Sequence, residues 1–577
     1  MLYARDYWYC LSIVLSSRRY CLSRPWFECK AVRGFIVNGY SVSGPLISAT
    51  TVGSLTWLVS LIYFQDKRLL AVLGLGVLIA LLWLDGFRGR KPDRQGSRWF
   101  RLYFSLLPCL LFLVYVYLES VFGYFDWGAM FMHAGAGMLT PGVVLEYLWN
   151  TGSTMLVILV VLLGFGALKA RGTLTRGLDV ALMAFFLAAN PMLTRPIAAA
   201  IHPNPLHDFL SRRFVDVTSL TKPAETASAT VAPKNLVHVF IESAERTYMN
   251  EAEFGDVMGP LLEFDRRGVS ATNMVQLAYT NNSISGMVAA NCGTPLLITF
   301  FTSRQYLEEQ SQFLPGLTCL GDALKARGYQ QNFVTGWPLS FTGQGTFYST
   351  HGYSSLFGGP EVVAAVAGRG NSFGADDAEV LDLSFGILRR AQRDGKPFSL
   401  TIAVSGGHAM DGYLTDKCIG KTGLSPQAPN ILHAVKCTNM LIADFIHKAE
   451  AEGLMANTVL ALQSDHLSAP SAVTDRLNKY ERRNFFSLSG DGIPSKTYAG
   501  LSGTIDIFPT ILDALGMPLS NDQAGLGVSL LGDQPTLCQA LGQDQFDDAI
   551  YAEDVLVRSF WQLKSTRTAV ASEAEPR

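Results

Sequence analysis

The chain has 577 residues, of which 49% are hydrophobic and only 16% are charged. Its mean hydropathy of +0.21 is too apolar for an ordinary soluble protein. The formal net charge of -2 gives no reason to expect nucleic acid as a partner. These values exclude a typical soluble domain and a basic nucleic-acid-binding protein.

The apolar excess lies in roughly the first 200 residues, in blocks near the length of about 20 residues that a helix needs to cross a bilayer. The five blocks run from about Leu46 to Phe64, Leu69 to Leu84, Leu102 to Phe122, Thr154 to Leu168 and Leu178 to Ala200. We therefore expect a transmembrane domain of five helices over residues 46–200. Residues 1–45 contain three Cys without a clear period, and whether they belong to the functional chain stays open.

The charges between these blocks predict the orientation of the chain. Lys and Arg are abundant before the first block and after the second and the fourth, whereas Gly123–Ser153 contains none. Because basic loops stay in the cytoplasm, the amino terminus is expected there. Five crossings then place everything after about residue 200 outside.

The cysteines agree with an external carboxyl-terminal half, where disulfides are permitted. Five of the nine Cys lie beyond residue 200: Cys292, Cys319, Cys418, Cys437 and Cys538. Nearest-neighbour pairing would join Cys292 to Cys319 and Cys418 to Cys437, but spacing alone does not fix the connectivity.

Beyond the membrane blocks, residues 201–233 are predicted to be a linker, because Ser219–Pro233 is rich in Thr, Ala, Ser and Pro. Residues 234–548 alternate between apolar strands and helical stretches, and 549–577 is predicted to be a tail that frays. The expected strands are 236–241, 398–404 and 458–463, and the expected helices are Leu317–Arg327, Ala378–Arg393 and Leu432–Glu452. This alternation predicts an α/β domain with a mostly parallel sheet between helices.

Two of these strands end in side chains that suit a metal. The run Leu236–Ile241 is followed by Glu242, and the run that begins at Thr458 is followed by Asp465 and His466. Side chains at the carboxyl ends of parallel strands converge on one crevice. Carboxylates and an imidazole gathered there predict a divalent-metal site.

The polar stretch Gln276–Met287 supplies candidate nucleophiles in Thr280, Ser283 and Ser285. It leads into a helical run, and a hydroxyl at a helix amino terminus suits an anionic phosphate. The alternative, that these residues are ordinary helix caps, stays open on spacing alone.

A set of short motifs, in order and with similar spacing, resembles the lipoteichoic-acid-synthase-like, sulfatase-type branch of the alkaline phosphatase superfamily. Within that branch, the motifs resemble the phosphoglycerol transferases of the osmoregulated periplasmic glucan pathway. The matching segments are 234–237, 242–248, 286–295, 319–322, 351–353 and 464–467. The resemblance implies an alkaline phosphatase/sulfatase-like fold over roughly residues 234–520.

The resemblance also implies roles for single residues. Glu242, Asp465 and His466 match metal ligands, with Mn2+ or Mg2+ as the ion. Ser283 falls where the family has a nucleophilic Thr that also contacts the metal, and Thr280 is the fallback.

For the substrate, the resemblance implies contacts from His408 and Trp337. Ser340 stands where a relative has an Arg, so Arg246 is a candidate for the missing phosphate contact. His351 and Asp506 are interpreted as structural. The four Cys at 292, 319, 418 and 437 fall at family positions.

These expectations describe a multi-pass protein of a bacterial inner membrane with its catalytic domain in the periplasm. It would transfer glycerophosphate from phosphatidylglycerol to a glucan through a covalent intermediate on Ser283. Phosphoethanolamine transfer to lipid A or another glycan, polyglycerolphosphate synthesis and a non-catalytic sensor or scaffold remain alternatives. A sulfatase is disfavoured, because no Cys/Ser-x-Pro-x-Arg motif stands near position 283.

Overall fold

The computed structural model describes residues 209–221, 233–297, 304–368, 370–371, 374–408, 411–553 and 555–562. Residues 1–45 and the five apolar blocks lie outside these ranges, so the membrane topology stays a prediction. Among the described residues, the structure has no helix with both the length and the apolar character needed to cross a membrane.

The centre of the fold is an eight-stranded sheet with the order β11-β2-β10-β9-β1-β8-β4-β5. Its strands are β1 (Asn235–Ile241), β2 (Val269–Ala271), β4 (Gln330–Thr335), β5 (Ser355–Phe357), β8 (Phe398–Val404), β9 (Thr458–Ser464), β10 (Phe486–Ser489) and β11 (Lys496–Tyr498). Strand β10 runs antiparallel to both of its neighbours, and the other pairings in this sheet are parallel. The predicted mostly parallel α/β sheet is confirmed.

Short strands and helices complete the domain. The short strands are β3 (Met274–Val275), β6 (Gly370–Asn371), β7 (Gly374–Ala375), β12 (Ser502–Gly503), β13 (Gln523–Ala524) and β14 (Gly527–Val528). The α-helices are α10 (Phe209–Arg213), α11 (Glu251–Phe254), α12 (Gly259–Arg267), α13 (Ser283–Cys292), α14 (Arg304–Glu308), α15 (Leu320–Ala326), α16 (Gln344–Thr350), α17 (Gly359–Val366), α18 (Asp377–Asp394), α19 (Asn430–Ala451), α20 (Thr474–Leu477), α21 (Ile507–Ala514), α22 (Leu537–Leu541), α23 (Gln543–Ala552) and α24 (Val555–Phe560). The 3-10 turns are η2 (Thr218–Thr221), η3 (Arg246–Met249), η4 (Phe341–Gly343), η5 (Asp416–Cys418) and η6 (Thr504–Asp506).

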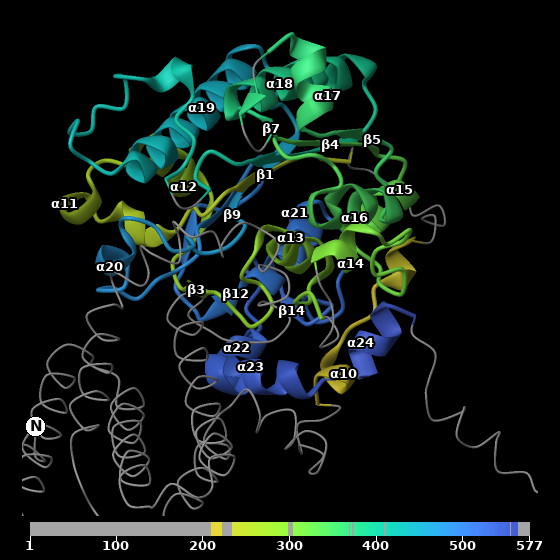
Figure 1. Ribbon diagram of the computed structural model, residues 1–577. Helices are drawn as coiled ribbons and strands as arrows, with labels where there is room; N and C mark the ends of the chain where they lie inside the picture. The colour runs from red at the N-terminus through yellow and green to blue at the C-terminus, as the bar shows by residue number, and fades with distance from the viewer. Residues whose placement is uncertain are drawn as a thin grey trace, which may run out of the picture. The chain divides into compact units, whose positions relative to one another are not determined.

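Strand β1 is buried along its whole length because both faces of the sheet are covered. Val237, Val239 and Ile241 pack in the core with α12, α17, α18 and α19. Leu236 and Phe240 point to the opposite core, which contains α13, α15, α16 and α21. Figure 1 shows these two helical layers on either side of the sheet.

The predicted strands and helices match β1, β8, β9, α15, α18 and α19 to within three residues at each end. The domain boundaries need correction. Residues 209–221, placed in the predicted linker, pack on the domain: Leu210 is fully buried, and Val215 exchanges backbone hydrogen bonds with Gly525.

The predicted tail also begins too early. Phe560 and Trp561 are buried, the ring of Phe560 lies 5.1 Å from that of Phe214, and the Trp561 indole donates to the Leu297 carbonyl. The described part of the domain therefore extends from residue 209 to residue 562, and apolar burial at both ends is the reason.

Both disulfides pair nearest neighbours. Cys292 at the end of α13 is joined to Cys319 just before α15, and Cys418 in η5 is joined to Cys437 in α19. Cys538 is free and buried. The first bond fixes the far end of the helix that begins at Ser283.

The contribution of the carboxyl-terminal helix can be measured in the full chain. Phe560→Ala removes a buried aromatic ring and is expected to lower the free energy of unfolding by roughly 3–5 kcal/mol. Val555→Ala, in the same helix but 45% exposed, should change it by less than about 0.5 kcal/mol. Equal effects in denaturant unfolding would contradict the packing described for α24.

Candidate metal-dependent active site

Two adjacent strands bring the predicted metal ligands together. Strand β1 pairs with β9 in a register that sets Ile241 opposite Ser464. The residues that follow these partners, Glu242 and Asp465, therefore leave the sheet side by side. His466 comes next, and one ligand atom from each of the three lies within 4.8 Å of the others.

The three side chains are buried and in mutual contact. His466 Nε2 lies 3.3 Å from Glu242 Oε1 and 3.4 Å from Asp465 Oδ2. His466 is 7% exposed, and the two carboxylates are each 2% exposed. The site is thus shielded from bulk water, which strengthens every electrostatic interaction within it.

Backbone geometry at Ser243 holds the two carboxylates. Ser243 has a φ of 58°, an unusual value for a non-glycine residue. In this conformation its N–H donates to Asp465 Oδ1 at 2.9 Å, and its hydroxyl donates to Glu242 Oε1 at 2.8 Å. The strained residue therefore orients one ligand from each strand.

The imidazole of His466 is oriented for ligation through Nε2. Its Nδ1 lies 2.8 Å from the Leu467 carbonyl oxygen, which can only accept a hydrogen bond. Nδ1 therefore carries a proton and donates it there. Nε2, which faces both carboxylates, is the atom available to a metal, as in many histidine-ligated sites.

The electrostatics of the trio fit a bound dication. Burial alone would raise the pKa of Glu242, but His466, then His408, and the Ser243 hydroxyl lower it to about 2. Burial and the charge of Glu242 raise the pKa of Asp465 to about 7. Burial opposes charge on His466, yet Asp465 and Glu242 raise its pKa to about 10. Protons thus fill the place that a divalent cation would take among these oxygen and nitrogen donors.

The predicted nucleophile lies in this cluster. Ser283 Oγ is 3.4 Å from Glu242 Oε2 and 3.5 Å from His466 Nε2. Ser283 is the first residue of α13, and Asn282 caps the helix by accepting from the Ser285 N–H at 3.1 Å. Ser283 is therefore placed where it could be a fourth ligand or a nucleophile.

Gly286 allows α13 to approach the metal ligands. A Cβ at this position would come within 1.8 Å of the Asp465 carbonyl oxygen. The helix therefore packs directly on the backbone of a ligand residue, a distance that only glycine permits.

Thr280, the fallback nucleophile, is directed elsewhere. It is fully buried, and its hydroxyl donates to the Leu277 carbonyl at 2.8 Å. The structure brings Ser283, and not Thr280, within hydrogen-bond reach of Glu242 and His466.

The loop after β8 carries His408 toward the same end of the sheet. A Cβ on Gly407 would lie 2.5 Å from the Glu242 carbonyl oxygen, so this loop packs against the residue that bears the ligand. The ring of Trp337 lies 6.3 Å from that of His408, edge to face. Trp337 is only 1% exposed, so it supports His408 from within rather than offering a surface to substrate.

The structure gives Arg246, the candidate for a phosphate contact, partners within the protein. Its guanidinium pairs with Asp265 at 2.7 Å, and also donates to the Ala271 carbonyl at 2.6 Å and to the Ser270 hydroxyl. These partners lie in α12 and β2, and they account for the buried position of the side chain. Ser340 is exposed and does not replace the cation.

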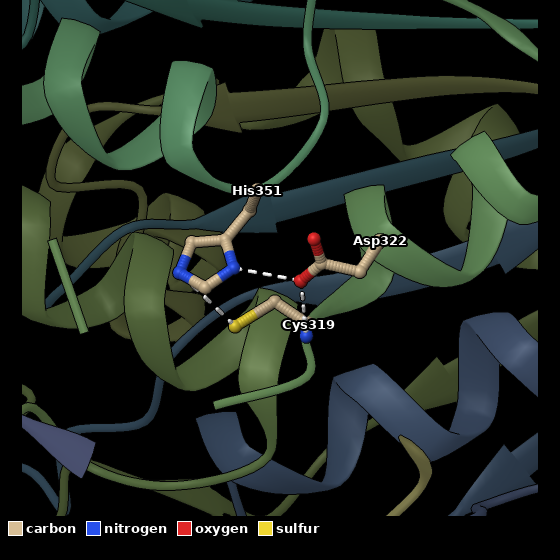
Figure 2. Close-up of side chains that lie close together, drawn as sticks. All are labelled: Cys319, Asp322 and His351. Carbon is tan, nitrogen blue, oxygen red and sulfur yellow. Dashed lines mark hydrogen bonds and ion pairs between the residues drawn. The ribbon is translucent and has the colours of Figure 1, made fainter. Parts of the chain in front are cut away.

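A second group of potential ligands is formed by Cys319, Asp322 and His351 (Figure 2). In the oxidised chain Cys319 Sγ is bonded to Cys292 and is no thiolate ligand. His351 Nδ1 lies 2.7 Å from Asp322 Oδ2, and its Nε2 lies 3.0 Å from the Phe313 carbonyl oxygen. This group stabilises the start of α15, which agrees with the structural interpretation of His351.

Comparison with known proteins supports the motif-based resemblance. Residues 234–517 match the Sulfatase family model. The described domain accordingly has the alkaline phosphatase/sulfatase-like α/β fold that the motifs predict.

The curated relatives agree in name. Phosphoglycerol transferase I of Citrobacter koseri is 36% identical over 304 residues, which cover 52% of this chain and 39% of that protein. Phosphoglycerol transferase I of Salmonella paratyphi B is 36% identical over 315 residues, which cover 54% and 41%. The matched region thus spans about two fifths of the length of these relatives. The resemblance to phosphoglycerol transferases is confirmed.

Among solved structures, the lipoteichoic acid synthase LtaP from Listeria monocytogenes aligns with a TM-score of 0.45 and 17% identity. The alignment covers 54% of this chain and 80% of that one. A protein of the alkaline phosphatase superfamily from Vibrio parahaemolyticus aligns with a TM-score of 0.44 and 16% identity, over 62% and 96% of the two chains.

Several residues that shape the site escaped sequence reasoning. Asp377 accepts hydrogen bonds from the Ser405 and Gly406 amides and so holds the loop that carries His408. Glu245, to which the sequence assigned no role, is fully buried. Glu245 could have been noticed in the sequence, because it closely follows the predicted ligand Glu242. Asp377 lies far from any motif and could not.

The protons that His466 and Asp465 hold in the metal-free site predict a metal affinity that depends on pH. At pH 6 a cation must displace protons from His466 and Asp465, whose pKa values stand near 10 and 7 without metal. Metal binding should therefore release protons, and the Kd for Mn2+ should fall at least tenfold between pH 6 and pH 8. Titration calorimetry in two buffers of different ionisation enthalpy would measure both effects. A Kd that does not change with pH would show that the metal displaces no protons from these residues.

Proposed function

We propose that this chain is a metal-dependent phosphotransferase that moves glycerophosphate from phosphatidylglycerol to a periplasmic glucan. The observation that carries the proposal is the position of the Ser283 hydroxyl, at a helix amino terminus and within 3.5 Å of two predicted metal ligands. The names of the curated relatives support the identity of the transferred group.

The reaction requires two displacements at phosphorus. In the first, Ser283 Oγ attacks the donor phosphodiester, the bond from phosphorus to the diacylglycerol oxygen breaks, and that oxygen takes up a proton as Ser283 loses one. In the second, a glucan hydroxyl attacks the glycerophosphoryl-serine, the bond from phosphorus to Oγ breaks, and Ser283 regains its proton. Such covalent catalysis divides one difficult transfer into two easier steps.

Glu242, Asp465 and His466 would hold Mn2+ or Mg2+, with Ser283 as an additional ligand. A bound dication lowers the pKa of a neighbouring hydroxyl and neutralises charge on phosphoryl oxygens. The chain itself adds the positive end of the α13 dipole, which favours an anionic phosphate attached to Ser283. His408 would bind the donor phosphate from the loop after β8.

The cellular setting is also a proposal. The five apolar blocks would anchor the chain in a bacterial inner membrane, beside the lipid donor. The two disulfides of the described domain suit an oxidising compartment such as the periplasm.

The donor and the nucleophile can be tested together. Full-length protein in detergent with Mn2+ should release diacylglycerol from fluorescent phosphatidylglycerol. Ser283→Ala should lower the rate at least 10³-fold, because the attacking oxygen is lost. Thr280→Ala should retain most of the activity, since the Thr280 hydroxyl is held by Leu277.

Phosphatidylethanolamine is the matched lipid control. Release from this lipid in place of phosphatidylglycerol would favour phosphoethanolamine transfer. Release from neither lipid, with a glucan present, would favour a non-catalytic sensor or scaffold. A variant Ser283→Ala that keeps its activity would overturn the nucleophile assignment.

A further inference from the structure

Glu245 forms a buried ion pair three residues after the predicted ligand Glu242. The Glu245 side chain is 0% exposed, and Arg482, whose side chain is 20% exposed, is its partner. Arg482 Nε donates to Glu245 Oε2 at 3.0 Å, and Nη2 donates to Oε1. A paired, two-pronged contact of this kind fixes geometry as well as charge.

The same pair holds the loop that follows His466. Glu245 Oε1 accepts from the Ser468 N–H at 3.0 Å, and Arg482 Nη2 donates to the Ser468 carbonyl at 2.6 Å. Both backbone groups of Ser468 are therefore bound by the ion pair. On the other side of the loop, the Leu467 N–H donates to the side chain of Gln276 at 2.7 Å.

The peptide between Leu467 and Ser468 connects this pair to the metal site. It contains the Ser468 N–H, which donates to Glu245, and the Leu467 carbonyl, which accepts from His466 Nδ1 at 2.8 Å. Because a peptide group is planar, fixing the N–H also fixes the carbonyl. A carboxylate, a peptide and an imidazole thus follow one another in a single hydrogen-bonded chain.

We propose that Glu245, neutralised by Arg482, is a positioning residue that orients His466 for metal binding through the Leu467–Ser468 peptide. In many metal sites a carboxylate accepts directly from the second nitrogen of the ligand histidine, and loss of that partner costs 10- to 100-fold in affinity or activity. Here the carboxylate acts through one peptide, whose polarised hydrogen bonds strengthen one another. This inference rests on the metal site of the proposed function but not on the identity of the lipid donor.

A neighbouring ion pair provides a matched control. Arg246 and Asp265 are also largely shielded from solvent, with side chains 11% and 10% exposed, and are joined at 2.7 Å. Their hydrogen bonds lead to α12 and β2 and not to the loop 466–468. A purely structural role for Glu245 would make both pairs equivalent with respect to metal binding.

The test measures Mn2+ affinity and thermal unfolding of the full chain in detergent. Glu245→Ala and Arg482→Lys are expected to raise the Kd for Mn2+ at least tenfold, and Glu245→Gln by less, because its amide oxygen can still accept from Ser468. Asp265→Asn should lower the Tm of the metal-free protein and leave the Kd within about twofold. If Glu245→Ala does not fold, Glu245→Gln and Arg482→Lys decide the outcome.

A kinetic measurement separates a loss of metal affinity from a loss of stability. Saturating Mn2+ should restore diacylglycerol release in Glu245→Gln, because its nucleophile is intact, but not in Ser283→Ala. Wild-type Kd in the Glu245 and Arg482 variants, or an equal loss in Asp265→Asn, would overturn the proposal. Tight Mn2+ binding without lipid cleavage would refute the proposed function and leave this inference standing.

Discussion

The site depends on one electrostatic constraint, the burial of two carboxylates at the ends of adjacent parallel strands. Glu242 and Asp465 are held together because β1 and β9 are paired in register and Ser243 donates to both. Buried negative charge of this density requires a compensating cation. Without metal, a protonated His466 supplies that charge, and the arrangement is therefore poised to exchange protons for a divalent ion.

The surrounding elements position this charge and bring the nucleophile to it. Gly286 lets α13 rest on the Asp465 backbone, which places Ser283 beside the carboxylates. The Cys292–Cys319 bond anchors the opposite end of that helix. The loop after β8 packs on Glu242 through Gly407, and Asp377 holds its base. The ends of β1 and β9, the start of α13 and the loop after β8 thus meet at one edge of the sheet, where an α/β fold places its ligands.

The sequence was sufficient for the features that depend on local pattern. Fully buried parallel strands appear as continuous apolar runs, so β1, β8 and β9 could be predicted, and with them the convergence of Glu242, Asp465 and His466. The five apolar blocks are equally clear in the sequence, but they lie outside the described residues, so the membrane domain stays a prediction. Ser283 could be preferred to Thr280 only through the family resemblance.

Features that depend on contacts distant in sequence could not be predicted. Arg246 was assigned to substrate because its partner Asp265 lies 19 residues away in another element. Glu245 was given no role in the site, because its partner Arg482 is 237 residues away. The packing of residues 209–221 and 555–562 likewise depends on tertiary apolar contacts that show no period in the sequence.

The position of a bound metal can be measured directly. Crystals grown with Mn2+ and measured at the manganese absorption edge would show anomalous density for each bound ion. We expect one strong peak among Glu242, Asp465, His466 Nε2 and Ser283 Oγ, which is lost in Asp465→Asn. A peak elsewhere, such as beside Asp322 and His351, with none at the ends of β1 and β9, would contradict this assignment.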